Sequence, residues 1–238
     1  MSRPTPPPPV RAPGTQVVRP SDAATLIIYR RAAAADIEVL MGERHAAHRF
    51  MPSRYVFPGG RIDPRDSRVR TATPLGAAAS AQLGRKLSPA RARAMAVAAV
   101  RETFEETGLI IGAPDPAPLR KPPAGWEAFF ETGFAPALGD LEYVARALTP
   151  PIRPVRFNAR FFIVESHHVS GEVRGSGELL DLNWFPLHQA AELELAGITK
   201  RILRHIQQRF QNGWAKATPD RPVTYFKWVE GGHEPIDE

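Results

Sequence analysis

The chain has 238 residues and no cysteine, which excludes disulfide bridges, thiolate nucleophiles and cysteine metal sites. It carries 31 Lys and Arg against 25 Asp and Glu, a net charge of +6. The arginines are scattered and no basic-aromatic cluster accompanies them, so we expect no nucleic-acid partner. No apolar run approaches the roughly 18 residues of a membrane helix. The N-terminus also lacks a signal-peptide pattern, so we expect a cytoplasmic protein without membrane association.

Proline dominates the first twenty residues, which contain almost no large apolar side chains. Proline fixes φ and removes a backbone donor, so residues 1–20 are predicted to form a disordered, partly extended tail. Residues 21–238 remain, which is enough chain for a single domain with one buried core.

In the first half of the chain, runs rich in β-branched and apolar residues predict strands. They lie at 24–29, 38–44 and 55–57. A turn over 32–36 separates the first two strands, and Pro58-Gly59-Gly60 ends the third. Residues 63–86 show no clear period and many small or charged side chains, and we interpret the segment at about 64–88 as an insertion.

Further along, Ser88 as N-cap and Pro89 at the first helical position begin a helix that should run over 90–107 and end at Gly108. The remaining predicted elements are a short helix at 126–134, strands at 141–148, at 160–164 and ending at 184–185, and a helix at 196–210. Strands of antiparallel character mixed with a few helices predict an α/β sandwich.

The predicted helix at 90–107 carries three glutamates near its C-terminal end. At ~100° per residue, Glu102, Glu105 and Glu106 lie together, nearly opposite the apolar Val97 and Val100. A solvated acidic face is the ordinary explanation. However, like charges four apart cost roughly 0.2–0.5 kcal/mol, and the helix C-terminus disfavours carboxylates by a further ~0.3–1 kcal/mol each. A divalent cation such as Mg²⁺ or Mn²⁺ would reverse the sign of these terms, so a metal site is the competing interpretation.

Two segments around this cluster resemble a known motif. Arg101–Leu109 reads RETFEETGL and resembles the end of the Nudix box, G-x5-E-x7-R-E-U-x-E-E-x-G-U. The upstream Phe57-Pro58-Gly59-Gly60 resembles the turn that opens the box. The resemblance implies a Nudix-type α/β/α sandwich with a mixed sheet and a catalytic helix, over roughly residues 23–230.

The same resemblance implies a chemistry. In Nudix hydrolases, water attacks a phosphorus of a pyrophosphate within a nucleotide-containing small molecule. It implies that Glu102, Glu105 and Glu106 hold Mg²⁺ (or Mn²⁺), joined by the Gly60 carbonyl. Glu102, Glu105 and Arg101 would be the catalytic residues, with Arg101 orienting Glu105 and one glutamate acting as base directly or through water.

This chain also departs from the standard box. Gly60 and Arg101 are 41 positions apart, whereas the standard box separates them by 14, so 27 extra residues lie between them. Position 93, where the box has a glutamate, is Arg93; Asp63 or Asp66 are candidates to replace that acid. The apolar position after Arg-Glu holds a threonine.

A long insertion at this point resembles the coenzyme A diphosphatase branch, whose upstream signature is L-L-T-x-R-[SA]-x3-R-x3-G-x3-F-P-G-G. Counted back from Phe57, Leu40 matches the first leucine, and Arg44 and Arg49 match both arginines as candidate phosphate-binding residues. The signature is not kept at Met41, Gly42, His45 and Ser53. The ordinary explanation for these arginines is pairing with solvent or with Glu43.

Other functions stay open at this point. A nucleotide-sugar or dinucleotide pyrophosphatase of the same fold is the nearest alternative to coenzyme A or acyl-coenzyme A as substrate. A Nudix-like sensor that binds a nucleotide without cleaving it is disfavoured by the intact glutamates. Glu178 is a further candidate, because some relatives recruit a late carboxylate, although an ordinary loop glutamate is the simpler interpretation.

Overall fold

The computed structural model describes residues 10–12, 14–32, 36–47, 51–117, 119–229 and 232–238. The strands are β1 (Ser21–Arg31), β2 (Ile37–Arg44), β3 (Tyr55–Val56), β4 (Gly59–Arg61), β5 (Gly112–Pro114), β6 (Phe134–Pro136), β7 (Glu142–Leu148), β8 (Phe157–Glu165), β9 (Leu179–Pro186), β10 (Thr224–Val229) and β11 (Gly232–Asp237). The helices are η2 (Pro64–Arg68), α1 (Ala77–Gly84), α2 (Pro89–Thr107), α3 (Glu127–Glu131), η3 (Ser166–His168), α4 (Leu187–Ala190) and α5 (Gly197–Gln211).

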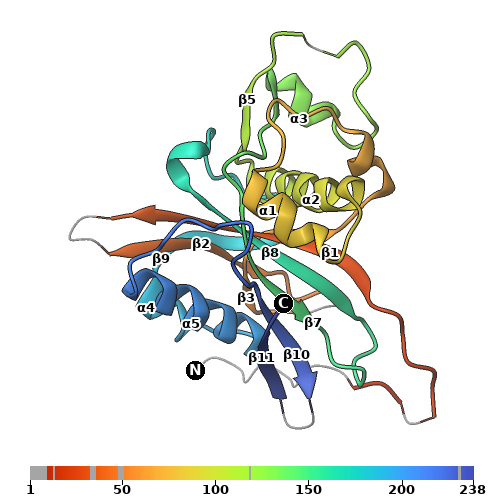
Figure 1. Ribbon diagram of the computed structural model, residues 1–238, viewed down its shortest axis with the longest axis vertical. Helices are drawn as coiled ribbons and strands as arrows, with labels where there is room; N and C mark the ends of the chain where they lie inside the picture. Colours follow the sequence, from red (N-terminus) through yellow and green to blue (C-terminus); the bar gives the residue numbers. More distant parts are fainter. Residues whose placement is uncertain (1–9, 13, 33–35, 48–50, 118, 230–231) are drawn as a thin grey trace.

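Among the described residues, one mixed sheet of nine strands organises the fold (Figure 1). Its order is β11-β10-β7-β8-β1-β2-β3, with β4 paired to β1 and β9 paired to β2. β1 pairs with β8, and β7 with β10, in parallel; the other pairs are antiparallel. β5 and β6 form a separate two-stranded sheet.

Both faces of the sheet are covered by helices, α1 and α2 on one side and α4 and α5 on the other, while α3 lies beyond α2 beside the small β5–β6 sheet (Figure 1). Successive side chains of a strand point to opposite faces. Leu26 and Ile28 of β1 therefore pack with the α2 side of the core, while Ile27 and Tyr29 pack with the α5 side. This double burial explains the nearly continuous apolar run of β1, and the predicted α/β/α sandwich is confirmed.

Helix α2 begins and ends where the sequence predicts. The Ser88 hydroxyl accepts a hydrogen bond from the Arg91 N–H at 3.3 Å, and Gly108 adopts φ 74° while its N–H donates to the Phe104 carbonyl. A positive φ is the conformation in which glycine avoids a Cβ penalty. The buried face of α2 is rich in alanine, which lets the helix lie close to β1.

The structure differs from the prediction in several segments, including the short β5, η3 and α4, which were not predicted. The insertion contains η2 and α1, which were not expected, because the α1 sequence AAASAQLG has little contrast between its faces and so no visible period. The expected helix at 126–134 is shorter, and β6 follows it. The β10–β11 hairpin was missed; β10 is recruited by pairing with the distant β7.

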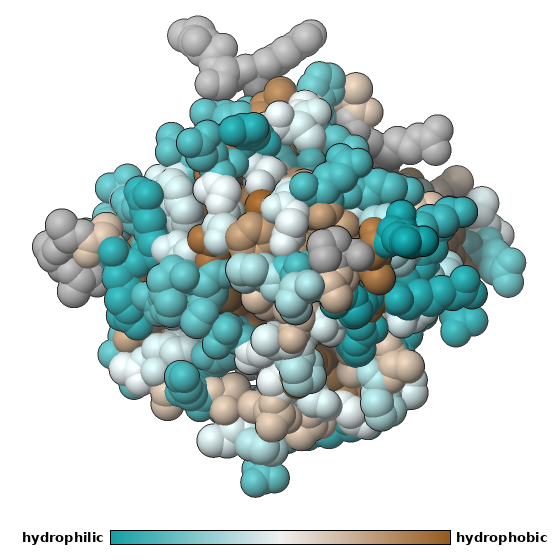
Figure 2. Space-filling view, turned by 90° about the horizontal axis from the view of Figure 1, so that it is seen from above, coloured by the Kyte–Doolittle hydropathy of each residue, from teal (hydrophilic) through white to brown (hydrophobic). Residues whose placement is uncertain are grey.

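Part of the predicted N-terminal tail, residues 1–9 and 13, lies outside the described residues. In the described part, the Arg11 N–H donates to the Ile152 carbonyl at 2.6 Å, and Arg156 donates to the Val18 carbonyl at 2.8 Å. Seen from the end that carries α3, the surface is mostly hydrophilic with small, interrupted hydrophobic areas (Figure 2). Among the described residues, no helix combines the length and apolar character needed to cross a membrane.

Candidate active site

The three glutamates predicted to act together lie on the last two turns of α2, in different environments. The side chain of Glu102 is 15% exposed and that of Glu105 is 44% exposed, whereas Glu106 is buried. The neighbouring Thr103 is fully buried and its hydroxyl donates to the Ala99 carbonyl at 2.7 Å. Threonine replaces the apolar residue of the box at this position, and its hydroxyl finds its hydrogen-bond partner within the helix itself.

Burial disfavours the charged forms of these carboxylates. It raises the pKa of Glu102 to about 7, against the opposing charge of Arg101. It raises the pKa of Glu106 to about 8, although Arg44 and the Gly59 N–H both favour the ionised form. Burial also raises the pKa of Glu105. Mutual repulsion among the glutamates adds to the effect, so the cluster is short of positive charge.

The turn that carries Gly59 and Gly60 closes over the cluster. The Gly59 N–H donates to Glu106 Oε2 at 2.8 Å, and β4 pairs with β1 so that Gly59 lies opposite Thr25. A Cβ at Gly59 would lie 2.5 Å from the Ala24 carbonyl oxygen, and one at Gly60 would lie under 3.0 Å from the Glu102 carboxylate. Only glycine allows the backbone to approach these carboxylates so closely.

The substitution Gly60→Ala is expected to reduce turnover about tenfold or more, because the added Cβ must displace the Glu102 carboxylate and misplacement of an active-site group by about 1 Å can cost ~100-fold. Steady-state kinetics measure the effect. Gly84→Ala is the matched control, because a Cβ there meets nothing within 4 Å. Equal activity of both variants and the wild type would show that Glu102 does not need its observed position.

Arg101 connects the cluster to the insertion. Its Nη1 lies 2.9 Å from Glu102 Oε1 and donates to Glu105 Oε2 at 2.9 Å. On its other side, Nε donates to Asp66 Oδ1 at 2.9 Å and Nη2 donates to the Arg61 carbonyl at 2.8 Å. The predicted contact between Arg101 and Glu105 is thus present in the structure.

Of the two acids considered as replacements for the box glutamate, Asp66 is the one that contacts Arg101, and it lies six positions after Gly60, the spacing of the acid in G-x5-E. Asp63 instead accepts a hydrogen bond from the Arg65 N–H at 2.8 Å as the N-cap of η2. Arg93, at the glutamate position, donates to the carbonyls of Ser67 and Val69. It therefore faces the insertion.

Of the two predicted phosphate-binding arginines, the structure describes only Arg44. Arg44, at the end of β2, is partly buried; desolvation lowers its pKa, while the charges of Glu106, Glu178 and Glu102 oppose this effect. Arg49 lies outside the described residues. Glu178 lines the same cavity as Arg44, and its carbonyl accepts from the His45 N–H at 3.1 Å. The late carboxylate therefore does lie in the neighbourhood of the glutamate cluster.

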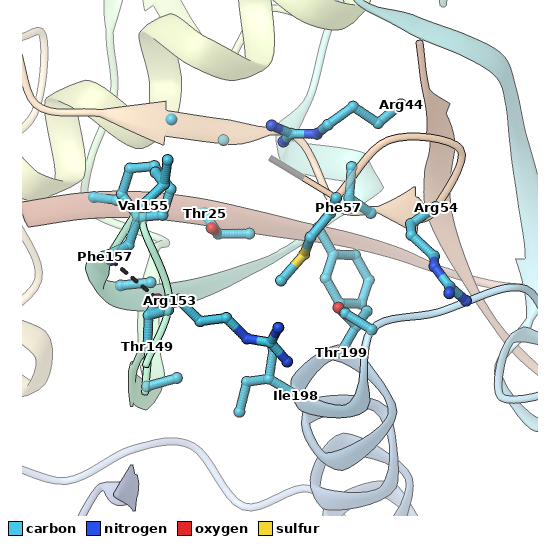
Figure 3. A pocket seen from close by; sticks show the side chains of 18 of the residues that line it. Thr25, Arg44, Arg54, Phe57, Thr149, Arg153, Val155, Phe157, Ile198 and Thr199 are labelled. Carbon is cyan, nitrogen blue, oxygen red and sulfur yellow. Dashed lines mark hydrogen bonds between the residues drawn. The ribbon is translucent and has the colours of Figure 1, made fainter. Parts of the chain in front are cut away.

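A cavity of about 940 Å³ extends from the cluster, within the size range of small-molecule sites. Glu102 and Glu106 line its acidic end. Figure 3 shows Arg44 along one edge and Arg153 reaching across toward Ile198 of α5. Other lining side chains are mostly apolar, among them Phe57, Val155, Phe157, Phe161 and Leu195.

Sequence reasoning missed Arg153 and the α5 contribution to this cavity. Arg153 lies in the proline-rich loop between β7 and β8, and Ile198 and Thr199 lie in the first turn of α5. No motif links these segments to the glutamates, because only the sheet brings them together. The proline spacing around Arg153 was the single available signal of a stiff loop.

The donor set suits a hard divalent cation. Carboxylate oxygens and a backbone carbonyl at Gly60 are the oxygen ligands that Mg²⁺ and Mn²⁺ prefer, and Mg²⁺ keeps several waters with only one or two carboxylates. In the part of the chain that the structure describes, no three acidic or imidazole side chains already converge on one point. Glu105 instead turns toward Arg101, and Glu106 toward the Gly59 N–H. A partly hydrated ion fits this arrangement, whereas a closed cage of three side chains does not.

We compared the chain with known proteins in order to identify its family. No protein-family model and no curated protein matches the chain. Among solved structures, the crystal structure of a NUDIX hydrolase from Alicyclobacillus acidocaldarius is 31% identical, with a TM-score of 0.62, over 79% of this chain and 91% of that one.

More distant structures are also similar. The Nudix hydrolase RenU from M. smegmatis is 15% identical, with a TM-score of 0.46, over 88% of this chain and 98% of that one. The NUDIX domain of Shewanella oneidensis NrtR, complexed with ADP ribose, is 12% identical, with a TM-score of 0.47, over 81% of this chain and 90% of that one. The family assignment depends on the Alicyclobacillus enzyme, whose identity over nearly its whole length accompanies the glutamate helix and the glycine turn described above. The chain belongs to the Nudix hydrolase family.

Proposed function

We propose that this Nudix hydrolase cleaves the pyrophosphate bond of a nucleoside diphosphate-linked small molecule in a reaction that depends on Mg²⁺ or Mn²⁺. The observation that carries the proposal is the pair of the partly buried Glu102 and the buried Glu106, whose pKa values are raised by burial, at one end of a large cavity, with Glu105 beside it. When bound, the cation would polarise the phosphoryl oxygens and lower the pKa of a bound water.

The residues of the chain would supply the metal ligands, the orienting contact and the general base. Glu102, Glu105 and Glu106, with the Gly60 carbonyl, are the proposed ligands; one or two of the carboxylates would contact the ion directly and the others through waters bound to it. Arg101 would orient Glu105 through the 2.9 Å contact, and Glu102 or Glu105 would accept the proton of the attacking water. The family establishes the reaction class; these individual roles are our proposal.

Arg44 is the proposed phosphate-binding residue. It lines the cavity together with Glu102 and Glu106, and its guanidinium suits two-point contact with a phosphate. Arg49 is kept as a second candidate on the coenzyme A signature alone.

For the substrate we propose coenzyme A or an acyl-coenzyme A. Beyond the acidic end, the cavity is walled mainly by apolar side chains such as Phe57, Phe157 and Ile198, which suit a linear, weakly polar chain. A nucleotide sugar would place several hydroxyl groups against walls that offer few polar side chains, such as Thr149 and Thr199, which disfavours it. Arg153 adds a cation that a further phosphate could contact, and coenzyme A carries such a group at its 3′ position.

The substrate proposal predicts a specific ranking. With Mg²⁺, kcat/KM should be higher for coenzyme A and acyl-coenzyme A than for ADP-ribose or a nucleotide sugar. The substitution Arg153→Gln should lower kcat/KM for coenzyme A by about 10- to 150-fold, because a charge-assisted contact contributes ~1.5–3 kcal/mol. It should change kcat/KM for 3′-dephospho-coenzyme A much less. Product analysis by chromatography identifies which phosphorus-containing fragments form.

The matched control is Arg204→Gln, which removes an exposed arginine of α5 outside the cavity. A wild-type preference for ADP-ribose would contradict the coenzyme A proposal and favour the dinucleotide or nucleotide-sugar alternative. Nucleotide binding without cleavage of any compound, with either Mg²⁺ or Mn²⁺, would contradict hydrolysis and favour a sensor.

A further inference from the structure

The cavity has an aromatic end, away from the proposed catalytic residues. Trp228 of β10 and His233 of β11 both line the cavity, and both residues are only partly buried. We propose that Trp228 is a substrate-binding residue, on which the adenine ring of the coenzyme A substrate stacks. The inference rests on the proposed function, and it also sets the direction in which the substrate lies in the cavity.

The pairing of the strands places Trp228 far from the glutamates. Ala23, Ala159 and Ala147 lie opposite one another on β1, β8 and β7, and all three line the cavity. The next strand is β10, in which Phe226 lies opposite Ala147. Neighbouring strands are about 4.8 Å apart, so β10 lies roughly 14 Å across the sheet from β1, the strand that pairs with the glycine turn. Trp228 therefore meets a part of the substrate that is remote from the pyrophosphate.

The two aromatic side chains at this end hold each other in place. Trp228 and His233 are direct partners across the β10–β11 hairpin, and their ring centroids lie 5.2 Å apart with an angle of 80° between the planes. His233 Nε2 donates to the Leu148 carbonyl at 3.1 Å, because a carbonyl oxygen can only accept. Burial lowers the pKa of His233, so its ring is neutral at pH 7. A ring that is fixed before binding loses little conformational freedom when a base stacks on it.

The chemistry of this end suits a nucleotide better than the pantetheine arm. A tryptophan ring stacks on the flat face of a nucleobase, whereas pantetheine is a flexible chain without a ring. Arg153 lines the same cavity from the loop after β7, and its guanidinium suits the 3′-phosphate of the same nucleotide. On the other side of β1, the cavity is lined by the apolar Val56 of β3 and by Met51 and Pro52 before it, which suit the pantetheine arm.

A purely structural role is the alternative for Trp228, because cross-strand aromatic pairs stabilise a hairpin by themselves. That role predicts a less stable variant and no selective effect on ligands. A stacking role predicts a selective loss for ligands that carry a base. The two products of coenzyme A cleavage separate these roles, since adenosine 3′,5′-bisphosphate contains the base and 4′-phosphopantetheine does not.

The test measures the binding of each product by titration calorimetry in the presence of Mg²⁺. Trp228→Leu should weaken the binding of adenosine 3′,5′-bisphosphate by about 5- to 150-fold, the factor that corresponds to the ~1–3 kcal/mol of one stacked base. Its affinity for 4′-phosphopantetheine should equal that of the wild type. Trp184→Leu is the matched control and should bind both products normally, because Trp184 of β9 packs against the α2 side of the core instead.

Fluorescence provides a second test that does not depend on the folding of Trp228→Leu. Trp228→Phe keeps an aromatic ring in the hairpin, so it should fold and retain most of the affinity for adenosine 3′,5′-bisphosphate. This nucleotide should quench the tryptophan emission of the wild type and of Trp184→Phe. It should quench the emission of Trp228→Phe much less, because the indole that contacts the base is missing.

Unchanged binding of adenosine 3′,5′-bisphosphate in Trp228→Leu would overturn the proposal, and so would an equal loss for both products or a loss confined to 4′-phosphopantetheine. Equal quenching in Trp228→Phe and Trp184→Phe would also overturn it. Failure of the proposed function is a separate outcome, in which the wild type cleaves no pyrophosphate compound. Product binding requires no cleavage, so calorimetry still supports or rejects the stacking role of Trp228 in that case.

Discussion

Replacing Glu105 or Glu106 by glutamine is expected to lower kcat by about 100- to 1000-fold while leaving the fold intact. Metal catalysis contributes several kcal/mol, and each 1.4 kcal/mol corresponds to a factor of about ten in rate. At position 106 a glutamine carbonyl can still accept the hydrogen bond from the Gly59 N–H, and the Glu105 side chain is half-exposed. Neither substitution therefore leaves a cavity in the core.

Steady-state kinetics at saturating Mg²⁺ measure the loss, and thermal denaturation verifies folding. Glu131→Gln is the matched control, because this exposed carboxylate of α3 lies outside the cavity. Its turnover should equal that of the wild type. Near-normal hydrolysis by both Glu105→Gln and Glu106→Gln would remove the basis for the proposed metal site.

The stability of the metal-free protein is expected to fall as pH rises from about 5 to 8.5. Burial raises the pKa of Glu102 to about 7 and that of Glu106 to about 8, whereas an unfolded glutamate titrates near 4.3. Over this window the folded protein binds more protons than the unfolded chain, so the free energy of unfolding decreases with pH. The stabilising effect is fully present below pH ~4.3 and is lost above pH ~8.

Summed over the two carboxylates between about pH 5 and 8, the raised pKa values correspond to a loss on the order of 7 kcal/mol and to roughly 14–28 °C in Tm for a domain of this size. Mg²⁺ should restore the lost stability, because it binds the ionised carboxylates of the folded protein and not the unfolded chain. The Mg²⁺-induced rise in Tm should therefore be larger at pH 8.5 than at pH 5.5.

Thermal denaturation over a grid of pH and Mg²⁺ concentration measures both effects. Glu106→Gln separates these effects from those of other titrating groups, because it removes the carboxylate whose pKa is raised more than that of Glu102. Its Tm should fall less with pH and respond less to Mg²⁺. A wild-type Tm that is independent of Mg²⁺ at pH 8.5 would contradict a site already formed in the folded state.

The sequence by itself determined the elements whose signals are local. The period of α2, its Ser88 cap and its Gly108 end depend on neighbouring residues, and so do the apolar runs of β1 and β2. The spacing of Glu102, Glu105 and Glu106 also placed the acid cluster, because residues three and four apart share a helix face. These local rules, together with the motif, were sufficient to predict the fold class and to place the three glutamates together at the end of α2.

Only the tertiary structure decided what surrounds that centre. Asp66 and Arg101 are 35 positions apart, and their contact depends on how η2 docks against α2, which no periodicity reveals. The short α1 lacks amphipathic contrast and is recognisable only by what it packs against. Arg153 and α5 enter the cavity because β7, β8 and β1 are neighbours in the sheet, an arrangement of distant segments set by pairing and burial. The local pattern specifies which residues share a helix face or a strand, but pairing across the sheet determines which of those faces meet.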